Sequence, residues 1–590
     1  MSADISDSES HQRAGRARIE FAVSVETGSN VLPSITDRAF ATEWQQVAKE
    51  DRKFTVLQEP AFVVSWYRQH EPLFEPVVCL GRGAGGRLVG VMALARSRVT
   101  GAMTHAGDFH ADYHGWTALP EVDDLFPVEC LIVLKRTFAL REWGWNWLPP
   151  GTSTAFLSAR SLAENRIFVT SRTAPSPVWN LEDAERLSEL SKTKSIRNQI
   201  NRFKKRGAFT LERVRDKKRT RDLMGVLRAQ CDFRQEVTQG IRPFADNPCK
   251  EPFFVGRQDF PEANHFTVLW SAGRPVSFHF GACSKGTLLL GLTAYDPTES
   301  RNSPGKVHLI ELARMLGEEG IRRIDLTPGG DQYKEFIANE SQDLTIPTFY
   351  FSRTAKVLAE TRGLLRKAAK ELLALTPIRP AALSAAVSRL RDLPARLRSV
   401  TTRKLVRRII CIFCEDIVYR QYSIRCSHEP AAGARDPEVS VQRYEDLLAY
   451  PHPSPRDRRT MLSDAMKRFA SGETLYSVAR GGQLLHYGWI ARGGQTHFLQ
   501  GVNVSFDSPA DSAVLYDFFT HPGFRGQGLY QRNLRQMLRD LAESGVQRAF
   551  IGVLEGNDSS RRAIEKIGFS LHRVYRRRRI LWMEKREEHA

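Results

Sequence analysis

The alternation of apolar and polar positions predicts a chain built of repeated units that mix helices and strands. Residues 61–67 follow a helical spacing, and the apolar runs 76–80 and 88–95 flank a glycine-rich turn, as two strands would. A basic helix is expected over 191–206, ended by Gly207. After it the pattern predicts a meander, a helix and a short strand, over 266–271, 276–282, 287–293, 307–320 and 323–326.

The last third of the chain predicts one compact domain of mixed order. Strands are expected over 416–424, 474–478, 484–491, 496–499, 514–520 and 548–553. Helices are expected over 441–450, 459–471, 528–544 and 558–566. The predicted fold class is therefore mixed α/β (α+β), with tandem domains that each hold a largely antiparallel sheet flanked by helices.

A basic segment separates the two regions. Residues 354–408 carry apolar residues at helical spacing, interrupted by Pro377, Pro380 and Pro394. From 353 to 408 there are 15 Lys and Arg residues against 3 acidic residues, so this segment holds most of the formal net charge of +19. Basic amphipathic helices favour contact with an anionic surface, either a membrane or a nucleic acid such as tRNA.

Length and composition indicate a folded chain of several domains. The 590 residues exceed the usual domain size several times, and 42% are apolar. No run reaches the roughly 20 apolar residues of a membrane-spanning helix, and the polar first 40 residues are typical of a flexible leader and not of a signal sequence. The eight cysteines are scattered, so we expect reduced thiols and a cytoplasmic protein, with peripheral contact at the inner membrane face through the basic segment.

One group of cysteines approaches metal-ligand spacing. Cys411 and Cys414 are followed by Cys426 and His428. The first pair lies inside an apolar run, where packing explains it, so no metal site is predicted.

One loop carries the pattern of an anion site. From 516 to 538 the sequence reads as a strand, a glycine-containing turn and a helix. Glycines there let backbone N–H groups converge on a phosphate, and the following helix N-terminus favours the anion. The residues expected to form this phosphate site are Arg525, Gly526, Gln527, Gly528, Leu529 and Tyr530. For a Gly-x-Gly taken alone, a surface turn with an N-cap is the alternative.

A second strand, turn and helix follows, with the sequence GNDSSRRAIEKIGF over 556–569. Together the two segments resemble the GNAT acyltransferase superfamily. In that family Arg/Gln-x-x-Gly-x-Gly/Ala binds the pyrophosphate of CoA, and the pattern falls on Arg525, Gly528 and Tyr530, where the tyrosine is a departure. The resemblance implies acetyl-CoA or a longer acyl-CoA as co-substrate, with further cofactor contacts at Asn557 and Ser560.

The resemblance also implies a course for acyl transfer. An amine attacks the thioester at a splayed strand, where backbone N–H groups around Phe519 and Thr520 polarise the carbonyl. Asp517 and Glu555 are candidate catalytic bases, directly or through water, and a structural or acceptor-binding role suits each equally well. Many GNAT enzymes place a tyrosine as acid where this chain has Ile564, so the thiolate leaves unaided or takes its proton elsewhere.

The region 55–350 carries other motifs. Read from chemistry alone, its polar residues near 331 to 334 belong to a turn and a helix start, which favours a structural role. Arg197, Ser303-Pro304-Gly305, Asp325 and Tyr333-Lys334 resemble CelD-type acetyltransferases, which are associated with bacterial cellulose or exopolysaccharide synthesis and, like the Fem aminoacyltransferases, have two GNAT-like halves. This resemblance makes Asp325 and Lys334 catalytic candidates without an assigned role.

These features predict five segments, which are a flexible polar leader (1–40), two GNAT-like halves (41–182 and 183–352), a basic helical linker (353–408) and a GNAT acyltransferase domain (409–585). The expected function is acyl-CoA-dependent N-acyl transfer to an amine on a sugar or on a cell-envelope or exopolysaccharide precursor. A Fem-like transferase that uses aminoacyl-tRNA and a non-catalytic acyl-CoA-binding scaffold are the alternatives.

Overall fold

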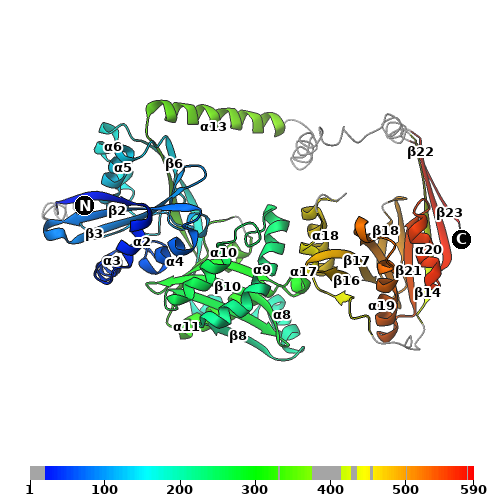
Figure 1. The fold of residues 1–590 in the computed structure, drawn as a ribbon. Helices are drawn as coiled ribbons and strands as arrows, with labels where there is room; N and C mark the ends of the chain where they lie inside the picture. The colour runs from blue at the N-terminus through cyan, green and yellow to red at the C-terminus, as the bar shows by residue number, and fades with distance from the viewer. Residues whose placement is uncertain are drawn as a thin grey trace, which may run out of the picture. The chain divides into compact units, whose positions relative to one another are not determined.

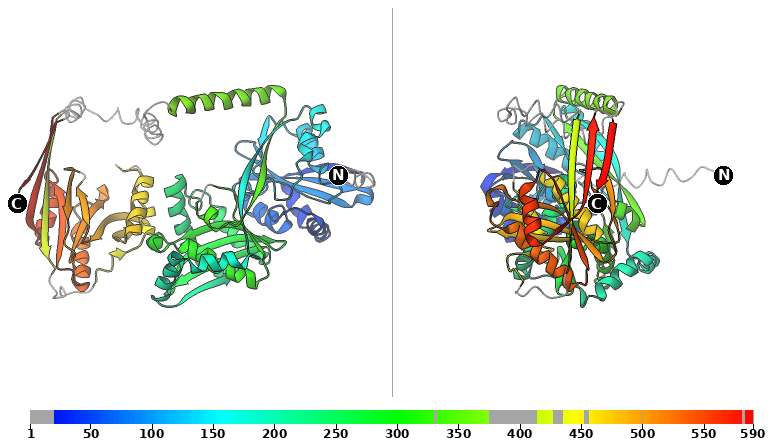
Figure 2. Two further views of the ribbon diagram at one scale, coloured as in Figure 1. Left: turned by 180° about the vertical axis from the view of Figure 1, so that it is seen from behind. Right: turned by 90° about the vertical axis from the view of Figure 1, so that its right-hand side faces the viewer.

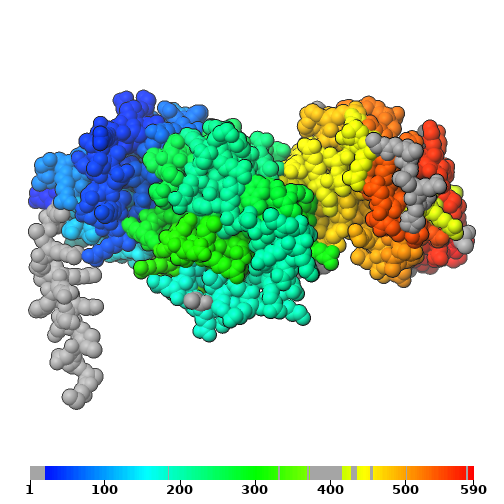
Figure 3. Space-filling view, turned by 90° about the horizontal axis from the view of Figure 1, so that it is seen from below, coloured from blue at the N-terminus to red at the C-terminus, as the bar shows by residue number. Residues whose placement is uncertain are grey.

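A computed structural model of the chain describes residues 20–329, 332–374, 414–426, 435–451, 456–499, 501–580 and 583–589. Contacts divide the chain into two units (Figure 1). The first unit comprises residues 1–231, 243–296 and 302–370, and the second comprises residues 232–242, 297–301 and 371–590. Figure 3 shows the surface of the first unit from blue to green and most of the second unit from yellow to red. The mixed α/β class with mostly antiparallel sheets is confirmed.

The first sheet of the first unit has the order β1-β2-β3-β4, with β5 paired to β3. Its strands are β1 (Phe21–Thr27), β2 (Phe74–Gly83), β3 (Leu88–Ser97), β4 (Met103–His105) and β5 (Thr117–Ala118). Its helices are α2 (Val31–Thr36), α3 (Arg38–Glu50), α4 (Pro60–His70), α5 (Phe126–Thr137) and α6 (Arg160–Glu164). Figure 1 shows α2 to α4 on one side of this sheet and α5 with α6 on the other.

Two glycines allow α5 to approach the first sheet closely. A Cβ at Gly81 would lie 2.8 Å from the Phe126 ring, and a Cβ at Gly90 would lie 2.9 Å from it. Any larger residue at either position would push α5 away from the sheet.

The predicted flexible leader, residues 1–40, is corrected by the structure over residues 21–40. Residues 21–27 form β1, which pairs with β2 over its whole length, and Val31 and Ile35 of α2 are fully buried. The alternation in FAVSVET is that of an edge strand with one partly buried face, and the polar residues around it obscured this pattern.

The second sheet of the first unit has the order β6-β13-β7-β12-β11-β10-β9-β8. Its strands are β6 (Glu142–Gly144), β7 (Phe168–Asn180), β8 (Phe209–Val214), β9 (Asn264–Ser271), β10 (Arg274–Ser284), β11 (Thr287–Tyr295), β12 (Arg323–Asp325) and β13 (Glu340–Tyr350). The β11 and β12 strands are parallel, and the other pairs are antiparallel. β6 and β7 precede the boundary predicted at residue 182 and still pair in this sheet.

The helices of this part of the chain are α7 (Ala184–Lys192), α8 (Lys194–Lys204), α9 (Lys217–Gln239), α10 (Lys250–Gly256), α11 (Pro304–Glu318) and α12 (Gln332–Ile337). The single basic helix predicted over 191–206 was wrong, because the chain turns at Thr193, which has an extended ψ of 126°. The buried residues of α8 and α11 share one apolar cluster with those of β11 and β12.

The C-terminal domain, residues 414–589, has one large sheet with the order β15-β16-β17-β20-β21-β14-β22-β23. Its strands are β14 (Cys414–Arg425), β15 (Ser440–Val441), β16 (Thr474–Arg480), β17 (Gln483–Arg492), β20 (Ser512–Thr520), β21 (Arg548–Leu554), β22 (Ser570–Ile580) and β23 (Met583–His589), with a separate pair β18 (Thr496–Leu499) and β19 (Val504–Asp507). Only β20 and β21 are parallel among these pairs of described strands. Figure 2 shows β14, β22 and β23 side by side.

The helices of this domain are α17 (Glu445–Leu448), α18 (Arg458–Ser471), α19 (Leu529–Glu543) and α20 (Asp558–Ile567). The helix predicted over 441–450 was wrong, because this stretch holds the end of β15 and only the short α17. α19 and α20 contact each other, and their buried residues pack with those of β20 and β21.

The described part of the predicted basic linker is one helix, α13 (Arg353–Ala374). The remainder of the linker, residues 375–408, lies outside the described residues, as do Cys411 and His428. None of the described helices combines the length and the apolar character that a membrane crossing requires.

Candidate functional site

The phosphate loop, residues 525–530, follows β20 and includes the first two residues of α19. Gly526 and Gly528 have φ angles of 81° and 74°, a left-handed conformation that glycine adopts without strain. A Cβ on either residue would meet nothing within 4 Å. The backbone conformation, and not a lack of space, therefore requires glycine here.

This loop presents free hydrogen-bond donors. α19 begins at Leu529 with Gly528 as its N-cap and without a side-chain cap. Across the described residues, the backbone N–H groups of residues 526–531 find no acceptor. Arg525 is exposed beside them. Free N–H groups, the positive end of a helix dipole and a guanidinium together form an anion site.

β20 and β21 part next to this loop. Their parallel pairing runs from Ser512 to Leu515 on β20 and ends opposite Ile551, although both strands continue beyond this point. On its other edge β20 stays paired with β17 as far as Thr520. The edge of residues 516–520 that faces β21 therefore has no ladder partner there. Phe519 and Thr520, predicted to polarise a thioester carbonyl, lie on this segment.

The two predicted bases of this domain are each held by arginines. Asp517 has a φ of 48° at the register shift between β17 and β20. It pairs with Arg456 at 3.1 Å and with Arg468. Glu555 accepts hydrogen bonds from Arg420 at 2.5 and 3.1 Å. Within the described residues, the structure shows no contact between these two carboxylates.

The second motif forms a helix start. Asn557 caps α20, and its Oδ1 accepts from the Ser560 backbone N–H at 3.3 Å and from the Ser559 hydroxyl at 3.1 Å. Its Nδ2 group has no acceptor among the described residues, so it is available to a ligand. Ile564 is fully buried in the core, which excludes contact with a departing thiolate.

Sequence reasoning missed Tyr419, which lies at the point where β20 and β21 part. A Cβ on Gly552, the residue after Ile551, would come within 1.7 Å of the Tyr419 hydroxyl oxygen. No acceptor for this hydroxyl is seen in the described part of the chain, and burial, with Tyr575 nearby, raises the pKa of Tyr419 to about 12. A glycine inside a strand signals such a close approach, but it does not name the approaching residue.

Asp325 and Lys334 belong to the first unit and form a cluster of their own. Asp325 is buried at the end of β12 and accepts a hydrogen bond of 2.5 Å from the Tyr113 hydroxyl. Lys334, also buried, donates to the Thr327 carbonyl and hydroxyl oxygens at 3.3 and 3.1 Å. The structure thus brings these two candidates to one place, and it adds Tyr113, 212 residues away from Asp325.

Two family models match separate parts of the chain. A model of an acetyltransferase (GNAT) domain matches residues 191–335, and a model of the acetyltransferase (GNAT) family matches residues 442–569. The first match contains Asp325 and Lys334, and the second contains the phosphate loop and the parting strands. A search of curated proteins found no match.

Solved structures show partial likeness to the chain. They include a conserved protein of unknown function from Bacteroides thetaiotaomicron, with 11% identity over 52% of this chain and 97% of that chain and a TM-score of 0.37. FemX has 11% identity over 52% of this chain and 95% of that chain, with a TM-score of 0.37. A GCN5-related N-acetyltransferase from Sphaerobacter thermophilus has 12% identity over 64% of this chain and 95% of that chain, with a TM-score of 0.21.

Proposed function

We propose that this chain, in which residues 191–335 and 442–569 match GNAT family models, is a tandem acyltransferase. Its C-terminal domain binds acetyl-CoA or a longer acyl-CoA and transfers the acyl group to an amine. The single observation that carries this proposal is the phosphate loop. Six backbone N–H groups without acceptors, over residues 526–531, lie beside the exposed Arg525. An anion with many oxygens, such as the pyrophosphate of CoA, satisfies such a row of donors.

The separation of β20 and β21 supports a binding site for the pantetheine arm of CoA between these two strands. Its amide groups would find the unpaired strand edge of residues 516–520 and the free Nδ2 group of Asn557. The thioester at the end of the arm would then lie near Phe519 and Thr520, whose backbone N–H groups can polarise its carbonyl.

In the proposed reaction the amine nitrogen attacks the thioester carbonyl carbon, a C–N bond forms and the C–S bond breaks. Glu555 takes the surplus amine proton through water, and the thiolate is protonated by solvent. A thiolate with a pKa of roughly 8.5 is a weaker base than a tyrosinate, and burial raises the pKa of Tyr419 to about 12. Tyr419 therefore keeps its proton and stabilises the departing sulfur by a hydrogen bond.

We infer that the acceptor is an amine on a sugar or on a cell-envelope or exopolysaccharide precursor. The support for this inference is the resemblance of residues 55–350 to CelD-type acetyltransferases. The same proposal places the protein in the cytoplasm, with peripheral contact at the inner membrane face through its basic segment.

Calorimetry with acetyl-CoA tests the donor site. Charge-assisted hydrogen bonds contribute roughly 1.5 to 3 kcal/mol, so Arg525→Ala should weaken binding about ten- to a hundredfold. Gly528→Val should weaken it as well, because the left-handed φ of 74° strains a β-branched residue. Arg535→Ala is the matched control, since Arg535 is an exposed arginine of α19, the helix that follows the loop glycines. Unchanged affinity in both loop variants would sink the assignment.

Thiol release with a panel of amino-sugars, polyamines and amino acids tests the reaction. An acceptor that raises the rate above hydrolysis supports transfer. If acyl-CoA binds and no acceptor raises the rate, the domain is a ligand-binding scaffold. Binding of aminoacyl-tRNA in place of acyl-CoA would favour the Fem-like alternative.

A further inference from the structure

A pocket of about 280 Å³ lies in the first unit, at the end of β12. Its lining residues include three cations, Arg52, Lys285 and Arg323, together with Asp325 and Gln342. All belong to the first unit. The volume is slightly below that of pockets for drug-sized molecules, so it suits a small metabolite.

Asp325 is the anionic residue of this pocket, and it is positioned by three donors. They are the Tyr113 hydroxyl at 2.5 Å, the Thr327 backbone N–H at 2.9 Å and the Gln342 side-chain amide at 3.3 Å. Burial raises the pKa of Asp325 in spite of these donors. A carboxyl held so firmly, with an oxygen lone pair still open, is prepared to accept a further hydrogen bond.

The backbone beside Asp325 carries strain. Thr327 has a φ of 61°, although a β-branched residue rarely adopts the left-handed region. Its carbonyl and hydroxyl oxygens both accept from the buried Lys334. A structural ion cluster needs neither such strain nor an open pocket, whereas ligand sites often show both.

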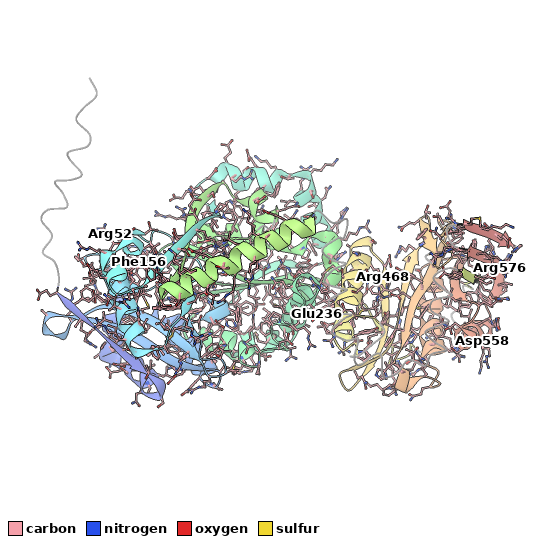
Figure 4. The ribbon with its side chains drawn as sticks, turned by 90° about the horizontal axis from the view of Figure 1, so that it is seen from above. Arg52, Phe156, Glu236, Arg468, Asp558 and Arg576 are labelled. Atoms are coloured by element: carbon pink, nitrogen blue, oxygen red, sulfur yellow. The ribbon has the colours of Figure 1, made fainter. Side chains whose placement is uncertain are left out.

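The cations of the pocket differ in how they are used. Arg323 pairs with Glu340 at 2.9 Å, and Lys285 donates to the carbonyl oxygens of Asp51 and Lys53 at 2.7 Å each. Arg52 is exposed and has no ion-pair partner within the described residues. Figure 4 labels it on the first unit. Arg52 is therefore the cation that can accept an anionic group without breaking another contact.

We propose that this pocket binds a small molecule that carries both an anionic group and an amino or hydroxyl group. Arg52, supported by Lys285, holds the anionic group. Asp325 and Gln342 hydrogen-bond the amino or hydroxyl group at the inner end. This binding site lies outside the C-terminal phosphate loop, and it gives the first unit a ligand of its own.

Titration calorimetry on the full chain tests the proposal with three probes, which are phosphoethanolamine, ethanolamine and inorganic phosphate. The phosphate loop is a competing anion site, so every titration is made with saturating CoA and repeated in the Arg525→Ala background. Phosphoethanolamine should bind at least tenfold more tightly than either single-group probe, because only it contacts both ends of the pocket.

Two variants and one control connect the binding to this pocket. Arg52→Ala should lower phosphoethanolamine affinity about tenfold, and Asp325→Asn should lower it by a similar factor while phosphate binding stays unchanged. Arg87→Ala, which removes an exposed arginine of the same unit, should have no effect. Arg52 is at the surface, so its variant reports on binding even if Asp325→Asn fails to fold. Absence of saturable phosphoethanolamine binding, or affinity that Arg52→Ala leaves unchanged, would overturn the proposal.

Discussion

At the residue scale, Asp517 and Glu555 look alike in the sequence and differ in the structure. Asp517 lies between two arginines, of which Arg468 has only 16% of its side chain exposed. Glu555 has 43% of its side chain exposed and one arginine partner. The Asp517 carboxylate is enclosed by its arginine partners, whereas the Glu555 carboxylate has a face open to water. We therefore propose Glu555 as the base that takes the proton of the amine.

Asp517→Asn should lower the free energy of unfolding of the C-terminal domain by about 1 to 3 kcal/mol, because it leaves partly buried guanidinium groups without their anion. Chemical denaturation monitored by tryptophan fluorescence measures this change. Glu555→Gln should instead lower kcat and leave CoA affinity and stability nearly intact. The reverse pattern, a stable Asp517→Asn protein with a low kcat, would make Asp517 the base.

Tyr419→Phe should lower kcat about ten- to a hundredfold, because a hydrogen bond to a charged group contributes roughly 1.5 to 3 kcal/mol. CoA affinity should change little, since the hydroxyl meets only the sulfur end of the cofactor. Ile564→Tyr is the comparison, and we expect no gain from it because Ile564 is fully buried. Equal kcat values for Tyr419→Phe and the unchanged protein would remove Tyr419 from the mechanism.

The buried carboxyl of Asp112, which lies near Asp325 and Lys334, makes the stability of the first unit depend on pH. Burial raises the pKa of Asp112 to about 6, against the opposing effect of Lys334. A carboxyl whose pKa is raised on folding binds more protons in the folded state, so its contribution to stability is greatest below about pH 4 and is lost as pH rises through 6. Thermal unfolding of the first unit should therefore show a fall between these values that Asp112→Asn reduces. An identical pH profile in the variant would contradict this prediction.

The conformation of the phosphate loop was predictable from the local sequence, because Gly526 and Gly528 adopt left-handed φ angles directly before the start of α19. Tyr419 and Tyr113 were not. The first reaches its place through pairing between β14 and β21, and the second meets Asp325 across 212 residues. Contacts made by the tertiary fold leave no local pattern from which one sequence reveals them.

At the element scale, periodicity located most of the C-terminal domain. The strand predicted over 514–520 is β20 (Ser512–Thr520), and the helix predicted over 528–544 is α19 (Leu529–Glu543). The errors fall where the signal is weak. β15 has two residues and α17 has four. Both are too short to show the two-residue period of a strand or the 3.6-residue period of a helix.

α13 has an exposed apolar stripe beside basic residues. Val357, Leu358, Leu364 and Leu365 are 54 to 70% exposed, and they share one face at helical spacing. Amphipathic helices with basic residues beside an apolar stripe bind the interface of anionic membranes, and we predict the same for α13. The chain should therefore float with anionic vesicles, less so as salt increases, because exposed charges are screened within about 8 Å at physiological ionic strength.

The double change Leu364→Glu and Leu365→Glu should abolish this flotation. Val99→Glu is the control, since Val99 is an exposed apolar residue of the first unit, outside α13. Equal recovery with neutral and anionic vesicles would exclude the membrane as partner, and preferential binding of tRNA would assign the basic segment to nucleic acid.

At the scale of the whole molecule, the sequence predicts tandem domains because two sets of motifs recur in one chain, and two family matches support this organisation. The sequence does not predict that β7 joins the second sheet. There β7 pairs with β13 over the eleven residues from Phe168 to Val178. The sheet that a strand joins depends on pairing with residues far away in the sequence. The period of hydrophobic residues does not encode this pairing.

The two proposed sites draw their residues from different units, since Arg52 and Asp325 belong to the first and Arg525 to the second. Two sites that share no residue are coupled only if the protein has two conformations and each ligand binds these conformations with different affinity. We therefore expect saturating CoA to change the affinity of the first unit for phosphoethanolamine less than twofold, as measured by calorimetry on the binding signal that Arg52→Ala removes, which excludes binding at the phosphate loop. The reciprocal titration, with CoA as the ligand, must give the same factor, because coupling in binding free energy is symmetric. A larger factor in both directions would show that the two sites are energetically coupled.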